Sequence, residues 1–267
     1  MKSHNSQLAD RAKNPLRNQM HPNISHHHLD INGIQLHVAE ALPATGDDQA
    51  PLALLLHGFP EYWGSWRSQM QALAEAGYRV WAPDLRGYGR SDKPPSVKDY
   101  RMKTLAEDVR QLVDAAGVEE CVLVAHDWGA AIAWFAAAEY PERFSRLLIA
   151  NVPHPVVFSR HISRNPSQMM RSWYIFFFQI PFLPEWYIGG GNFNRMANNL
   201  AKTANPGSFT EEMLQGYRES WGHGGFGPMI NYYRAAARYP DRLKNKRIHC
   251  PTLILWGKKD HALGFEM

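Results

Sequence analysis

The residue best placed to do chemistry in this sequence is Asp127, an acid that follows an apolar run. Residues 121–125 are aliphatic or small, and an alanine-rich segment typical of a helix begins just after the acid. Ala125 and Gly129 flank Asp127 at two-residue spacing, so the chain can turn sharply there. Such a turn pushes the central side chain into the open, as in a nucleophile elbow. The pattern also fits a second interpretation, in which Asp127 only caps the helix.

The elements that must position Asp127 alternate between strand and helix over the first half of the chain. Residues 26–41 predict a hairpin that turns at Asn32-Gly33. The run at 52–56 is apolar throughout, so that strand should be buried on both faces. Together these patterns indicate an α/β fold with a mostly parallel sheet and helices on both faces. The predicted strands after the hairpin are 52–56, 79–82, 121–125 and 146–150, and the predicted helices are 65–76 and 105–116.

The second half of the chain predicts an insertion into this fold. From residue 152 to residue 242 the strand patterns disappear and aromatic residues become frequent, which predicts helices lying over the carboxyl edge of the sheet. Residues 251–257 then restore the strand pattern. We therefore expect a disordered tail at 1–25, a first part of the core at 26–151, a helical cap at 152–242 and a second part of the core at 243–267.

The composition argues against several classes of partner. The 267 residues carry a net charge of +4 without a Lys/Arg run, so nucleic acid is not expected. The most apolar segment, 173–188, contains two prolines and a glutamate, so no membrane span is expected. Cys121 and Cys250 lie at predicted core strands, and we expect reduced, buried thiols in a compartment such as the cytoplasm. The three histidines at 26–28 alternate between strand faces, so we predict neither a metal ion nor a cofactor.

Four motifs occur in a fixed order along the chain: HGFPE at 57–61, DLRGYGRS at 84–91, HDWG at 126–129 and NVPHP at 151–155. With them the sequence resembles the α/β hydrolases and, within that fold, the epoxide hydrolases, over residues 26–267. The resemblance implies an α/β-hydrolase fold, with a mostly parallel sheet, helices on both faces and a helical cap insertion. Ala125 departs from the glycine of many relatives in the wider fold, but it is small enough for the turn.

The resemblance implies a reaction and roles for particular residues. Asp127 would be the nucleophile, and the backbone N–H groups of Phe59 and Trp128 would form the oxyanion hole. Asp260, just after the strand that ends near Gly257, would be the acid that orients a histidine base. The implied substrates are a small apolar epoxide and water, which would pass through an ester on Asp127 to a vicinal diol.

Two tyrosines of the insertion are implied to hold and protonate the epoxide oxygen. Tyr233 matches the family's motif best and Tyr174 is the second, whereas Tyr232 is the neighbour that could be confused with Tyr233. The chemistry suits these residue types. An ionised carboxylate, with an ordinary pKa of about 3.9, attacks a strained carbon without a base. The ring oxygen leaves only when it is protonated, and phenols with a pKa of about 10 can do this. Each tyrosine could instead be a core aromatic.

The family's triad also requires a histidine after the acid, and here the sequence departs from the pattern. Seven residues follow Asp260, and their one histidine, His261, is not expected to reach Asp127. His223 is the least implausible substitute. We therefore find no catalytic histidine and expect ester formation to survive while ester hydrolysis is impaired, because loss of a general base costs about 10²–10⁴-fold. The other histidines near the motifs are His57, His126 and His154.

The family's last strand and last helix also have no counterpart in the sequence, which suggests a truncated relative. We then expect residues 252–256 to form an exposed edge strand, which would invite aggregation or pairing with another chain, such as a homodimer.

Two other functions remain open. A haloalkane dehalogenase-like enzyme would share the aspartate nucleophile, and the indole N–H of Trp128 would suit a halide. The loop Phe59-Pro60-Glu61 and the two tyrosines match the epoxide group better. A non-catalytic ligand-binding protein or a gene fragment would account for the missing histidine.

Overall fold

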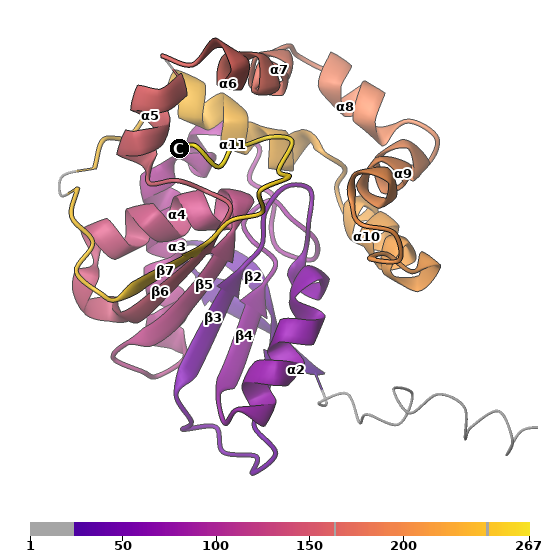
Figure 1. Cartoon of the computed structure of the whole chain (residues 1–267). Coiled ribbons are helices and arrows are strands. Elements are labelled where there is room, and N and C mark those ends of the chain that lie inside the picture. The colour runs from indigo at the N-terminus through magenta and orange to yellow at the C-terminus, as the bar shows by residue number, and fades with distance from the viewer. Residues whose placement is uncertain (1–23, 163, 244–245) are drawn as a thin grey trace, which may run out of the picture.

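The computed structural model describes residues 24–162, 164–243 and 246–267. Within these residues the strands form a seven-stranded sheet in the order β1-β2-β4-β3-β5-β6-β7 (Figure 1). The first two pairings, β1 with β2 and β2 with β4, are antiparallel, and every later pairing is parallel. The predicted mostly parallel sheet is therefore confirmed. The strands are β1 (Ile24–Ile31), β2 (Ile34–Ala41), β3 (Leu52–Leu56), β4 (Arg79–Pro83), β5 (Cys121–His126), β6 (Phe144–Ala150) and β7 (Thr252–Leu255).

The centre of the sheet forms as the apolar runs predict. All five residues of β3 are buried, because β3 lies between β4 and β5 and helices cover both of its faces. Figure 1 shows α2 on one side of the sheet and α3 and α4 on the other. Helix α2 spans Arg67–Glu75, α3 spans Met102–Ala115 and α4 spans Asp127–Glu139. The alternation of strands and helices therefore gives a covered parallel sheet, with its carboxyl ends on one edge.

The hairpin starts earlier than predicted. β1 begins at Ile24, two residues inside the segment expected to be a tail, because Ile24 pairs with Ala41 at the end of β2. The rest of that segment, residues 1–23, lies outside the described residues.

Between β6 and β7 the described chain forms helices and no strand, as the aromatic-rich sequence predicts. Figure 1 shows these helices beyond the carboxyl ends of the parallel strands. Of the residues that the structure describes, none belongs to a helix with the length and hydropathy needed to cross a membrane. The helices are α5 (Pro155–Ile162), α6 (Pro166–Arg171), α7 (Trp173–Phe177), α8 (Leu183–Gly189), α9 (Asn194–Thr203), α10 (Glu211–Gly222) and α11 (Gly227–Arg238).

The last strand, β7, is an edge strand. It pairs with β6, and no other strand of the described chain pairs with it. All four of its residues are exposed, and Leu253, Ile254 and Leu255 are each about half exposed. The prediction of an exposed edge is thus confirmed. The prediction of two buried core thiols is wrong for Cys250, which is only partly buried because it precedes this uncovered strand, whereas Cys121 is buried.

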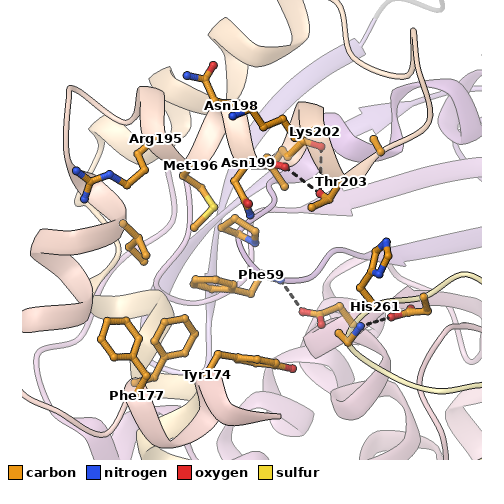
Figure 2. Close-up of a pocket in the computed structure, with 18 of the residues that line it drawn as sticks. Phe59, Tyr174, Phe177, Arg195, Met196, Asn198, Asn199, Lys202, Thr203 and His261 are labelled. Carbon is orange, nitrogen blue, oxygen red and sulfur yellow. Dashed lines mark hydrogen bonds between the residues drawn. The ribbon is translucent and has the colours of Figure 1, made fainter. Parts of the chain in front are cut away.

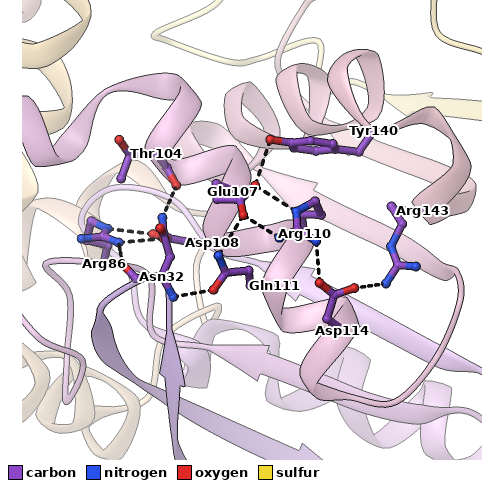
Figure 3. Close-up of polar contacts among 10 residues, drawn as sticks. All are labelled: Asn32, Arg86, Thr104, Glu107, Asp108, Arg110, Gln111, Asp114, Tyr140 and Arg143. Atoms are coloured by element: carbon purple, nitrogen blue, oxygen red, sulfur yellow. Dashed lines mark hydrogen bonds and ion pairs between the residues drawn. The ribbon is translucent and has the colours of Figure 1, made fainter.

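A buried ion pair fastens the loop at 84–91 to the rest of the core. Arg86 donates through Nε and Nη2 to the two carboxylate oxygens of Asp108 on α3, at 2.8 and 2.7 Å. Asn32, at the turn between β1 and β2, donates its side-chain N–H to Asp108 Oδ1 at 2.7 Å. Figure 3 shows this cluster beside the more exposed ion pairs of Arg110. Burial raises the pKa of Asp108, and Arg86 opposes this rise. The ionised form of Asp108 is therefore stabilised by Arg86.

Replacing Arg86 by methionine should destabilise the fold by about 3–5 kcal/mol, because the buried Asp108 would lose its cation. The matched substitution Arg110→Met removes partly exposed pairs with Glu107 and Asp114 and should cost less than about 1 kcal/mol. Urea unfolding of the two variants measures both values. Equal costs would show that burial of the Arg86–Asp108 pair does not decide its contribution.

Candidate active site

Asp127 lies at a sharp junction between β5 and α4. Its backbone φ is +50°, in the left-handed region that non-glycine residues seldom adopt. Gly129, in the first turn of α4, packs against β3, and a Cβ there would lie 2.3 Å from the carbonyl oxygen of Leu56. The small residue is thus required by the close approach of helix and strand. The interpretation of Asp127 as a helix cap is wrong, since the N-cap of α4 is His126 and no side chain caps that end.

The Asp127 carboxylate points toward two backbone N–H groups. The N–H of Phe59 donates to Oδ1 at 2.7 Å, and the N–H of Trp128 also bonds the carboxylate. Burial raises the pKa of Asp127, while the positive charge of His126 and the two N–H groups oppose that rise. Phe59 and Trp128 are the two residues that the sequence proposes as oxyanion-hole donors, and the structure places both N–H groups at the carboxylate.

Two of the three candidate tyrosines line one cavity with Asp127. Tyr174 and Tyr233 are among its lining residues, with their ring centroids 5.9 Å apart. Burial raises the pKa of both hydroxyls, and the charge of Asp127 raises it further, so both remain protonated at neutral pH. Tyr232 points elsewhere, because its hydroxyl donates to the Arg86 carbonyl at 2.7 Å and its ring is buried. The geometry therefore separates Tyr233 from its neighbour.

Asp260 also lines this cavity, after β7. Its Oδ1 accepts the N–H groups of Ala262 and Leu263 at 2.7 and 2.9 Å, and its Oδ2 accepts the side-chain N–H of Asn151. These bonds hold the carboxylate at the cavity. No histidine bonds to Asp260 within the described residues, so its proposed role as an orienting acid has no partner here.

The structure sorts the candidate histidines by position. His57 is fully buried, and its hydrogen bonds to described residues go to backbone groups, at Gly58 and Leu85. His223 lies at the exposed end of α10 and is not among the residues that line the cavity, so the structure argues against it as a substitute base. His126 and His261 do line the cavity. His261 thus comes closer to the site than the sequence predicts, but no hydrogen bond joins it to Asp127 in the described chain.

The cavity is large, and it is lined by aromatic residues on one side and by residues of α9 on the other. Its volume is about 1070 Å³, slightly above the range of about 300–1,000 Å³ that is usual for small-molecule sites. Figure 2 shows Phe59, Tyr174 and Phe177 on one side, and Met196, Asn199 and other residues of α9 on the other. The aromatic side adjoins Asp127, so an apolar ligand would contact rings next to the carboxylate. Across the described ranges, no group of three or more His, Cys, Asp or Glu side chains could hold a metal ion.

Comparison with known proteins places this geometry in a family. The α/β-hydrolase fold family matches residues 51–264. The AB hydrolase superfamily protein YfhM of Bacillus subtilis is 38% identical over 240 residues, 90% of this chain and 82% of that protein. Epoxide hydrolase 4 of mouse is 38% identical over 244 residues, and the alignment covers 88% of this chain but only 66% of the mouse protein. The crystal structure of a Bacillus megaterium epoxide hydrolase with an inhibitor is 32% identical, with a TM-score of 0.81 over 90% of this chain and 85% of that chain. This chain belongs to the epoxide hydrolase branch of the α/β-hydrolase family.

The sequence does not single out one pair of residues in this epoxide hydrolase site. His126, next to the proposed nucleophile, faces Glu61 of the loop at 57–61, with Nδ1 and Oε2 3.3 Å apart. Burial lowers the pKa of His126, but Glu61 and Asp127 raise it to about 9 overall. Burial raises the pKa of Glu61, but His126 and the Gly58 N–H lower it to about 2. Both residues lie within the motifs of the sequence. Because 65 residues separate them, the sequence alone does not show that they form a pair.

Removing Glu61 should therefore change the titration of His126. In Glu61→Gln we expect the pKa of His126 to fall from about 9 to near or below its ordinary 6.5. By linkage, the pair stabilises the fold fully below pH 6.5, while Glu61 is ionised, and this stabilisation is lost as the pH rises through about 9. An NMR titration of the His126 ring protons measures the shift, with the exposed Glu75→Gln as the control. An unchanged pKa of His126 would show that Glu61 does not hold its proton.

Proposed function

We propose that this chain opens an apolar epoxide by attack of the Asp127 carboxylate on a ring carbon. The observation that carries the proposal is the position of Asp127, which is held by backbone N–H groups in a cavity that two protonated tyrosines share. In the first step a carboxylate oxygen bonds the carbon and the carbon–oxygen bond of the ring breaks. The freed oxygen takes a proton from Tyr174 or Tyr233, and the product is an ester on Asp127.

The second step is hydrolysis of that ester to a vicinal diol. Water attacks the ester carbonyl, and the N–H groups of Phe59 and Trp128 stabilise the developing negative charge. The bond between the carbonyl carbon and the ester oxygen then breaks, which releases the diol and the Asp127 carboxylate, and the proton lost by the water returns to the tyrosine that protonated the epoxide. This step gains from a histidine base, and the described residues bring His126 and His261 to the cavity, without a bond from Asp260 to either. In the 267-residue chain we therefore expect the ester to form faster than it is hydrolysed.

The lining supports apolar substrates, because aromatic rings adjoin Asp127. Aromatic or lipid-like epoxides should fit this part of the cavity better than sugars.

The test is intact-protein mass spectrometry after incubation with styrene oxide, with Asp127→Asn as the control. We expect a stable adduct of one epoxide on the unmodified chain and none on the variant. Diol is assayed in the same tube. Diol without an adduct would show that another group acts as the base for ester hydrolysis. It would contradict our expectation that the ester forms faster than it is hydrolysed.

The absence of both adduct and diol would overturn the proposal and favour a non-catalytic ligand-binding protein. Halide release from brominated alkanes, in a parallel incubation, would instead support a dehalogenase-like activity.

A further inference from the structure

Helices α7 and α8 present an apolar surface that the reaction does not use. Phe182 is 84% exposed, Trp186 72%, Phe176 66% and Trp173 61%. An aromatic side chain buries about 150–250 Å² when covered, so these four expose on the order of 500 Å². A patch of that size is as large as the largest on typical monomers, where such patches are often functional. We define the outer aromatic face by Trp173, Phe176, Phe182, Leu183, Trp186 and Tyr187.

Ring contacts join two residues of this face, and the face adjoins the cavity. The ring of Phe177 lies 5.8 Å from that of Trp173 and 6.0 Å from that of Tyr187, and so joins α7 to α8. Trp173 and Tyr187 are exposed on the face and also line the cavity. Trp173 and Tyr187 therefore connect the outer aromatic face with the cavity.

One residue of the face, Phe182, combines an unfavourable backbone conformation with an exposed ring. Phe182 precedes α8 with a φ of +63°, a conformation that costs free energy for a bulky residue. Its ring gains no burial in return, since it is the most exposed of the large apolar side chains described. Burial of the Phe182 ring against a partner surface would offset that cost in free energy.

Basic residues accompany the face. Between residues 164 and 203 the chain carries four basic residues and one acid, Glu185. Arg195 and Lys202 line the cavity that Trp173 and Tyr187 also line. Glu185 pairs with Arg234 at 2.6 Å, which neutralises it. The guanidinium of Arg195 lies 4.8 Å from the ring centre of Tyr187, at the border of the face. The basic residues are Arg164, Arg171, Arg195 and Lys202.

We propose that the outer aromatic face binds an anionic lipid surface, with the cavity mouth against the bilayer. Tryptophan and other apolar side chains bordered by Lys and Arg are the composition of helices that lie in a membrane interface. A second copy fits less well, because a two-fold contact through this face would bring Arg195 of the two copies close together. Anionic headgroups would neutralise these charges.

The test is co-sedimentation of the full chain with vesicles of phosphatidylglycerol and phosphatidylcholine in equal parts, and with pure phosphatidylcholine vesicles. We expect binding to the mixed vesicles that weakens with salt. The double variant Phe182→Ser/Trp186→Ser should lower the partition coefficient about 10-fold or more, and Lys202→Glu should lower it by a smaller factor. The control Met213→Ser removes an exposed apolar side chain on α10 and should bind as the parent chain does.

The proposal would be overturned if the chain did not bind the mixed vesicles, or if the double variant bound them equally well. It would also be overturned if light scattering showed a concentration-dependent dimer that the double variant abolishes, while neither protein binds vesicles. Asp127→Asn should bind vesicles normally, so the outcome is independent of the epoxide chemistry. Circular dichroism melts of all variants confirm that each is folded.

Discussion

Replacing Tyr233 by phenylalanine should slow formation of the Asp127 ester about 10²-fold, and removing both tyrosine hydroxyls should slow it toward 10⁴-fold. A positioned proton donor contributes about 10²–10⁴-fold, and a second tyrosine, Tyr174, shares the cavity. The loss should appear in the rate of adduct formation, measured by quenched single-turnover mass spectrometry. The rings remain, so the packing of Tyr233 on Phe59 and Trp128 should be kept.

The matched control is Tyr232→Phe, one residue away on α11. Its hydroxyl bonds the buried Arg86 carbonyl, so its removal should cost about 1–3 kcal/mol of stability with little change in rate. A larger loss of rate in Tyr232→Phe than in Tyr233→Phe would reverse the assignment of the two residues.

The pH dependence of ester formation follows from the same groups. Burial raises the pKa of Asp127 above its ordinary 3.8, so the rate should fall with decreasing pH at a higher pH than for a free carboxylate. The pKa values of Tyr174 and Tyr233 are raised above 10, so the rate should hold through pH 9.

The elements that the sequence predicts well are those whose cause is local. The strand at 52–56 follows from five consecutive apolar residues, and the turn at Asp127 follows from small residues at fixed spacing around it. These features need no knowledge of distant segments, because the burial of a central strand and the close approach at Gly129 leave their mark on neighbouring residues.

The features that the sequence does not decide depend on distant contacts. Tyr232 and Tyr233 are adjacent and both buried. Only the packing of α11 against the loop at 84–91 and against Trp128 sends one hydroxyl to Arg86 and the other side chain to the cavity. The raised pKa of His126 likewise depends on Glu61, which the fold brings from another loop. The start of β1 at Ile24 depends on a partner in β2.

Gly129→Ala should impair both the fold and the site. The new Cβ would lie 2.3 Å from the Leu56 carbonyl oxygen and 2.5 Å from that of His57, and both are backbone atoms of the central strand or its end. Backbone cannot rotate away as a side chain can, so α4 must move from β3. We expect a loss of about 1–3 kcal/mol in unfolding free energy, as for an overpacked core.

The same movement should reach the chemistry, because α4 begins at Asp127. A displacement of about 1 Å at a reacting group can cost about 10²-fold, and here it would stretch the 2.7 Å bond from the Phe59 N–H to the carboxylate. We therefore expect ester formation to slow about 10²-fold at temperatures where Gly129→Ala remains folded. Gly222→Ala is the control: a Cβ there meets nothing within 4 Å, so this change in α10 should leave the rate unchanged and stabilise the helix by at most about 1 kcal/mol. A folded Gly129→Ala variant with the parent's rate would show that the close approach of α4 to β3 does not position Asp127.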